Sequence, residues 1–157
     1  MNDQKTFGEM LPGLQIIEHT KYKDNRGDFC ELWKINTDSM RGDFRQLNCA
    51  TSTHAVLRGM HRQNQTKLVM PVHGKIFDVA LDPENGKWFG IILDTSNALL
   101  IPPQYAHGYL VLSNVATVQY IVDAPYNKAE EENFNWNKYG IEWTLDVEPI
   151  LSAKDAE

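Results

Sequence analysis

The feature that most constrains the fold is a series of short runs rich in β-forming residues, each ended by a turn signal. Residues 75–82 form one such run, which ends in Pro-Glu-Asn-Gly. Similar runs follow at residues 88–93, 98–101, 109–112 and 117–122. Between residues 44 and 124 no long stripe of apolar residues recurs at helical spacing. Many short strands with frequent turns are typical of a sandwich or barrel, so we expect an all-β fold.

The C-terminal third of the chain is more polar, and residues 129–133 indicate a short helical turn. We expect Trp136 and Trp143 to cover one end or edge of the barrel. Chain ends usually fray, but we expect the run Leu-Ser-Ala-Lys-Asp at residues 151–155 to be ordered. No repeat or linker divides the 157 residues, which suit a single domain spanning residues 1–157.

The net charge of −6 argues against a nucleic-acid partner, because nucleic-acid binders usually need a basic face. A few clustered cations would still make a positive pocket for a small anionic ligand. Cys30 and Cys49 form no C-x-x-C pair, so zinc is not expected; a disulfide stays open, but a reduced protein is the simpler interpretation. With no signal-peptide segment and no apolar run near the roughly 18 residues of a membrane span, we expect a soluble cytoplasmic protein without a membrane partner.

His61 is the first candidate for chemistry. Histidine ordinarily titrates near neutral pH and is the commonest general base, although a single histidine is more often packed or on the surface. Arg58, three residues earlier, would point to the opposite face of a regular strand. Gly59 lies between them and could mark a β-bulge or a close backbone approach.

Three further residues are candidates. Lys67 precedes the apolar run 68–72, where a lysine is usually a solvated edge charge. His107 follows a proline-rich turn and precedes a glycine that would let a ligand approach the backbone; a histidine satisfied within its loop is an equal alternative. Tyr120 lies on the inward face of its predicted strand, where a core tyrosine with a satisfied hydroxyl is the simplest interpretation.

The histidines lack the H-x-H pair through which many small β-barrel enzymes hold a metal ion. They are scattered along the chain at His19, His54, His61, His73 and His107. We therefore expect no metal site and no cofactor.

Nine short motifs follow one another along the chain. They are D-x-R-G-x-F-x-E at 24–31, Q-x-N at 46–48, V-L-R-G-x-H at 56–61, K-L-V at 67–69, G-x-I-F-D-V-A-x-D at 74–82, I-P-P-x-x-A-H-G at 101–108, V-x-Y at 118–120, Y-N at 126–127 and L-S-A-K-D at 151–155. In this order they resemble the dTDP-4-dehydrorhamnose 3,5-epimerase family, whose members are cupin-type jelly rolls. The resemblance spans about residues 14 to 155 and implies a double-stranded β-helix, a jelly-roll barrel, with short C-terminal helical turns.

The resemblance also implies a mechanism. His61 matches the general base, Asp155 the carboxylate that orients it, and Tyr120 the proton donor across the sugar. Lys67 matches a position near the keto oxygen. A ketone at C4 acidifies the hydrogens at C3 and C5 because the carbanion delocalises into an enolate, which a fixed cation stabilises. One base and one acid on opposite faces then invert a carbon without a metal.

The remaining matched positions imply substrate binding. They are Gln46, Asn48, Arg58, His107, Tyr126, Glu131 and Lys154. Tyr126 corresponds to a residue that stacks on the nucleotide base. Arg26, Phe29 and Glu31 match an N-terminal segment that reaches across a homodimer in this family, so we expect a homodimer with this segment exchanged.

The chain departs from the family pattern around substrate access. The connection 62–66 and the turn 82–86 are short, and Arg62 stands where an aromatic residue is common. The main prediction is an epimerase that inverts C3 and C5 of a dTDP-4-keto-6-deoxy-hexose. A mono-epimerase acting at C3 or C5 only, and an enzyme for UDP- or GDP-4-keto sugars, stay open. Two other classes are a non-catalytic nucleotide-sugar-binding cupin and a ketoisomerase.

Overall fold

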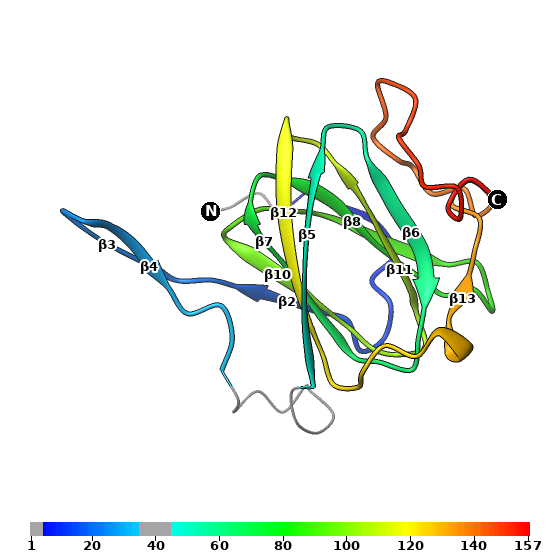
Figure 1. Cartoon of the computed structure of the whole chain (residues 1–157), viewed down its shortest axis with the longest axis horizontal. Coiled ribbons are helices and arrows are strands. Elements are labelled where there is room, and N and C mark those ends of the chain that lie inside the picture. The colour runs from blue at the N-terminus through cyan, green and yellow to red at the C-terminus, as the bar shows by residue number, and fades with distance from the viewer. Residues whose placement is uncertain (1–4, 35–44) are drawn as a thin grey trace.

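The computed structural model describes residues 5–34 and 45–157, in which two antiparallel sheets face each other and a hairpin stands apart (Figure 1). The strands are β1 (Thr6–Gly8), β2 (Gln15–Glu18), β3 (Lys21–Asp24), β4 (Gly27–Cys30), β5 (Gln46–Thr53), β6 (Leu57–Arg62), β7 (Lys67–His73), β8 (Ile76–Leu81), β9 (Trp88–Leu93), β10 (Asn97–Ile101), β11 (Ala106–Val111), β12 (Val115–Val122) and β13 (Glu132–Asn133). The first sheet has the order β1-β9-β8-β11-β6-β13, and the second has the order β2-β10-β7-β12-β5. This double-sheet architecture confirms the predicted jelly-roll barrel.

Side chains of the two sheets alternate between the interior and the outer faces. In β8, Ile76 and Ala80 join an interior cluster with Val69 and Val118 of the second sheet. The intervening Phe77, with its neighbours Val79 and Leu81, joins a separate cluster on the outer face of the first sheet. Because both faces of β8 are buried, the strand is apolar in the sequence at every position except Asp78.

The C-terminal segment covers the outer face of the first sheet. Trp136 and Trp143 pack against its cluster, and the Trp143 ring meets Phe77 edge-on at a centroid distance of 5.8 Å. The prediction that these two tryptophans cover an end or edge of the barrel is therefore wrong. The odd-numbered residues of β8 present an apolar surface outward, and burying it requires a cover on that face.

The strand predictions agree with the structure, with shifted ends. Residues 88–93 are β9, while β11 and β12 begin earlier than expected, at Ala106 and Val115. The helical turn predicted at 129–133 is a 3-10 helix, η1 (Lys128–Glu130), capped by the side chain of Asn127. It ends sooner than expected because Glu132 and Asn133 instead pair with β6.

The hairpin β3–β4 projects away from the barrel (Figure 1). Arg26 lies in its turn and forms an ion pair with Asp24. Two aromatic side chains on the hairpin, Tyr22 and Phe29, are 60% and 63% exposed. Within the described residues, no helix is long and apolar enough to cross a membrane.

Candidate active site

A β-bulge in β6 brings Arg58 and His61 to the same face. His61 pairs with His107 and Arg58 with Tyr109, so Gly59 and Met60 together lie opposite the single residue between those two partners. The φ angle of Gly59 is +125°, and a Cβ atom there would lie 2.5 Å from the Cα atom of Gly108. Only glycine fits this close approach. The alternative raised by the sequence, a regular strand with the two side chains on opposite faces, is thereby ruled out.

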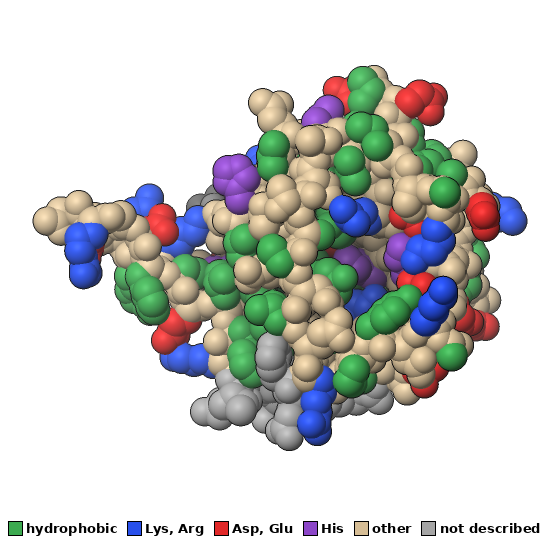
Figure 2. Space-filling model, in the orientation of Figure 1, with side chains coloured by type: hydrophobic (Ala, Val, Ile, Leu, Met, Phe, Trp, Pro, Cys, Tyr) green, Lys and Arg blue, Asp and Glu red, His purple; other side chains and the backbone are tan. Residues whose placement is uncertain are grey.

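These side chains line a cavity of about 540 Å³ between the two sheets. Figure 2 shows this face of the molecule hollowed, with histidine and basic side chains at the floor and rim of the hollow. The predicted site residues that line the cavity are Arg58, His61, Lys67, His107, Tyr120, Tyr126, Glu131, Lys154 and Asp155.

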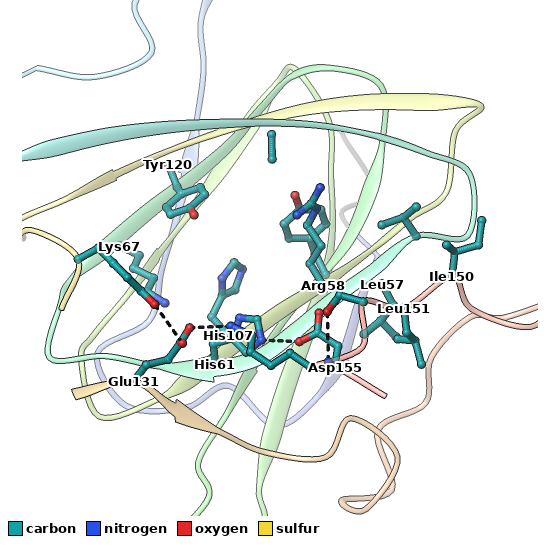
Figure 3. A pocket seen from close by; sticks show the side chains of 16 residues that line it. Leu57, Arg58, His61, Lys67, His107, Tyr120, Glu131, Ile150, Leu151 and Asp155 are labelled. Carbon is teal, nitrogen blue, oxygen red and sulfur yellow. Dashed lines mark hydrogen bonds and ion pairs between the residues drawn. The ribbon is translucent and has the colours of Figure 1, made fainter. Parts of the chain in front are cut away.

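His61 and Asp155 form a close pair on one wall of the cavity (Figure 3). The Nε2 atom of His61 lies 2.5 Å from Oδ1 of Asp155. Burial would raise the pKa of the Asp155 carboxyl, but the hydrogen bond and charge of His61 hold that pKa below its usual range. If Nε2 donates to this carboxylate, Nδ1 of His61 is left as the proton acceptor.

The C-terminal segment holds Asp155 against β6. The backbone N–H of Ile150 donates to the carbonyl oxygen of Ala55 at 2.8 Å, and its own carbonyl accepts from Leu57 N–H at 3.0 Å. The backbone N–H of Asp155 donates to the hydroxyl oxygen of Ser152 at 3.2 Å. Residues 151–155 are therefore ordered, as expected, and they complete the cavity wall.

Tyr120 approaches the cavity from the opposite side (Figure 3). It lies on β12 of the second sheet, whereas His61 lies on β6 of the first sheet, and the two sheets face each other. Burial raises the pKa of the Tyr120 hydroxyl, and the charge of Arg58 opposes this shift. The tyrosine therefore carries a proton at neutral pH, and it faces the histidine across the space a ligand would fill.

Lys67 is the most buried cation of the cavity. Burial lowers the pKa of its amine to about 8, although the charges of Asp78 and Glu131 oppose the shift. The side chain follows the two-residue alternation of β7 and lies on the same inward face as Val69. It is therefore not the solvated edge charge that a lysine at this position usually is.

His107 has a partner that sequence reasoning missed. Its Nε2 atom lies 2.7 Å from Oδ1 of Asp78, a carboxylate with no exposed surface. Asp78 interrupts an apolar run between Phe77 and Val79, and such a charge inside a buried strand is a recognisable signal. Tyr109 was also missed: it lines the cavity, and burial raises the pKa of its hydroxyl to about 12.

The outer part of the cavity is a network of polar side chains. Glu131 accepts hydrogen bonds from Lys154 Nζ at 2.9 Å and from the Tyr126 hydroxyl at 3.2 Å. Gln46 and Asn48 do not line the cavity themselves. Gln46 donates to Asn48 at 2.7 Å and accepts from the backbone N–H of Tyr126 at 2.9 Å, so the pair supports the Tyr126 backbone.

Three predicted site residues of the N-terminal segment lie outside the cavity. Arg26, Phe29 and Glu31 lie on or next to the hairpin β3–β4 and contribute nothing to the cavity of their own chain.

Within residues 5–34 and 45–157, no group of three or more His, Cys, Asp or Glu side chains is placed to hold a metal ion. The chemistry that these cavity side chains themselves offer is proton removal, proton return and stabilisation of a negative charge.

Known proteins resemble the chain over most of its length. A protein from Neisseria gonorrhoeae named dTDP-4-dehydrorhamnose 3,5-epimerase is 38% identical over 92% of this chain, which spans about half (49%) of that longer protein. A protein of the same name from Shigella flexneri is 38% identical, over 92% of this chain and 89% of its own length.

A solved structure agrees with these matches. The dTDP-6-deoxy-D-glucose-3,5-epimerase of Legionella pneumophila, in complex with dTDP-4-keto-L-rhamnose, has a TM-score of 0.89 and 33% identity, and covers 98% of this chain and 90% of its own. The family model described as dTDP-4-dehydrorhamnose 3,5-epimerase matches residues 9–157. The chain therefore belongs to the dTDP-4-dehydrorhamnose 3,5-epimerase family.

Proposed function

We propose that this protein is an isomerase that inverts C3 and C5 of a dTDP-4-keto-6-deoxy-hexose. The observation that carries the proposal is the placement of His61, paired with Asp155, and of Tyr120 on opposite walls of one cavity. A base and an acid on opposite faces of a sugar are what inversion requires. Family membership supplies the substrate class.

The proton transfers follow from these positions. His61 removes a proton from the carbon next to the C4 ketone, and Asp155 stabilises the imidazolium that forms. The electron pair moves to the ketone oxygen, where Lys67 stabilises the enolate. Tyr120 returns a proton to the opposite face of the carbon, and the ketone reforms with the configuration inverted.

Side chains in the outer part of the cavity are suited to bind the nucleotide. Arg58 and Lys154 supply positive charge at the cavity, suited to a diphosphate. Tyr126 is half exposed and offers an aromatic face for stacking on the base. These side chains, with His107, Glu131, Gln46 and Asn48, are proposed to fix the substrate in the orientation that His61 needs.

Isotope exchange tests the function directly. Incubation with dTDP-4-keto-6-deoxyglucose in deuterated water is expected to place deuterium at both C3 and C5, because each inversion exchanges one carbon-bound proton with solvent. Mass spectrometry and proton NMR measure the label at each carbon. Label at one carbon only would establish a mono-epimerase instead. Tight binding without label would establish a binding protein, and the UDP and GDP sugars, run in parallel, identify the nucleotide.

We also propose that residues 1–157 form one catalytic domain and that it acts as a homodimer. Each hairpin β3–β4, with Glu31, would complete the site of the partner. The support is the hairpin itself, which projects from the barrel and exposes the rings of Tyr22 and Phe29, with centroids 6.4 Å apart. An exposed aromatic pair on a projecting hairpin is typical of a buried contact in an assembly.

Mixing two inactive variants tests this exchange. His61→Ala lacks the base, and Arg26→Ala with Phe29→Ala lacks the hairpin contacts. If the hairpin serves the partner, a mixed dimer contains one site with an intact base and an intact hairpin, so mixing restores activity that neither variant has alone. Absence of recovery in mixed dimers confirmed by mass spectrometry would contradict the exchange.

A further inference from the structure

Residues 128–132, here called the wall segment, separate two cavities. The catalytic cavity lies on one side, and a second cavity of about 600 Å³ lies on the other, lined by Arg62, Gln104 and residues of the wall segment. Glu131 contributes to both cavities. A segment with cavities on both sides lacks the close packing that fixes most of the chain, so its polar contacts determine its position.

Arg62 makes one of these contacts through its guanidinium group. Its Nε donates to Oε2 of Glu132 at 2.7 Å, and its Nη2 donates to Oε1 at 3.0 Å, a two-pronged pair. The same guanidinium donates to Glu84 and to the carbonyl oxygen of Gln104, both at 3.2 Å, and stacks over the ring of Phe134 at 5.3 Å. Only 18% of the Arg62 side chain is exposed, whereas the side chains of its partners Glu132 and Glu84 are 53% and 78% exposed.

Neighbouring side chains of the wall segment point in opposite directions. Glu132 points to Arg62, and Glu131 points into the catalytic cavity, where it holds Lys154 and Tyr126. This follows the two-residue alternation of an extended chain, in which fixing one side chain fixes the orientation of the next. The Arg62–Glu132 ion pair therefore acts together with the backbone pairing of Glu132 and β6 to fix the position of Glu131 on the inside.

We propose that Arg62 is a positioning residue that sets the affinity for the nucleotide sugar. It holds the wall segment through Glu132, and so holds Glu131, Lys154 and Tyr126 where the substrate meets them. The inference rests on the proposed function for its substrate and on the contacts above for its mechanism. The proton-transfer residues His61 and Tyr120 lie on β6 and β12, outside the wall segment, so the main expected effect is on substrate binding.

Two matched substitutions distinguish an effect on the position of the wall segment from the effect of removing one negative charge. Glu132→Gln and Glu84→Gln each remove one negative charge from a partner of Arg62, but only Glu132 belongs to the wall segment. If charge alone matters, both variants bind the anionic substrate more tightly than the wild type. If Arg62 positions the wall segment, Glu132→Gln binds it more weakly. The Glu132 side chain is half exposed, so neither variant is expected to unfold.

The expected result for Glu132→Gln is a KM about threefold to fivefold higher, the size of one lost half-exposed ion pair, with kcat within about twofold of the wild type. Calorimetry with dTDP should give a matching rise in Kd, and Glu84→Gln should stay near the wild type in all three quantities. In the protein without ligand, hydrogen exchange followed by mass spectrometry should show faster exchange of the amides of residues 128–133 in Glu132→Gln only.

Equal KM and equal amide exchange in the two variants would overturn the inference, as would a fall in kcat at unchanged KM. Failure of the proposed function looks different. In that case the wild type itself would neither label the sugar nor bind dTDP, while the amide exchange of the two variants would still report whether the pair holds the wall segment.

Discussion

The variant His61→Ala is expected to lose deuterium exchange at both C3 and C5, with a fall in rate of about 10³-fold or more. The imidazole is the group placed to accept the proton, since Asp155 engages its Nε2 atom and leaves Nδ1 for the substrate. Alanine removes the acceptor and leaves Asp155, which is behind the imidazole, too far back to replace it. Measurement of label by mass spectrometry over long incubations gives the residual rate.

Two controls keep this result specific. His73→Ala removes an exposed histidine at the end of β7, outside the cavity, and should exchange at the wild-type rate. Calorimetry with dTDP should give His61→Ala an affinity near that of the wild type, because the side chains proposed to bind the nucleotide lie in the outer part of the cavity. Exchange in His61→Ala at the wild-type rate would remove His61 from the mechanism.

Much of the fold follows from the sequence because strand and turn signals are local. The Pro-Glu-Asn-Gly turn after β8 and the apolar runs at β9, β10 and β12 are encoded within a few residues each. The pairing of the strands is not local: the family resemblance implies a jelly-roll barrel, and only the structure gives the order β1-β9-β8-β11-β6-β13. The same limit explains the wrong prediction for Trp136 and Trp143, since β8 is buried on both faces and its sequence does not say what covers each face.

The site divides in the same way. The sequence does not decide between a bulge at Gly59 and a regular strand, because the bulge depends on how β6 and β11 align. The pairing of His61 with Asp155 joins residues 94 positions apart and was reached only through the family motifs. The His107–Asp78 pair is not predictable from the motifs at residues 101–108 and 74–82, since neither motif indicates that β8 and β11 are neighbours.

Lys67→Met is expected to reduce the rate of exchange by about 10²-fold or more, because it removes the charge that stabilises the enolate. Methionine fills a similar volume in the buried site without a charge. The exposed Lys138 offers a control, and Lys138→Met should leave both the rate and the free energy of unfolding close to those of the wild type. A Lys67→Met variant with the wild-type rate would show that the enolate is stabilised by another group.

The same substitution has a second, pH-dependent consequence for stability. The pKa of Lys67 is about 8 in the folded protein, against 10.5 for an ordinary lysine. Between these values the unfolded chain binds more protons than the folded one, so the free energy of unfolding of the wild type rises with pH through this window. Below pH 8 both states are protonated and the full penalty of burying the charge applies. Lys67→Met has no such penalty at any pH, so its stability advantage over the wild type should shrink by about 2–3 kcal/mol between pH 7 and pH 10.

Urea unfolding of both proteins at several pH values measures this difference, and subtracting the two curves cancels every other titrating group. A difference that does not change between pH 7 and pH 10 would mean that the amine is not depressed by burial. The wild-type rate should also fall above about pH 8, since the lysine loses the charge it uses. One buried amine thus links the two measurements: the burial that destabilises the folded protein at neutral pH also keeps water away from the charge that we propose stabilises the enolate.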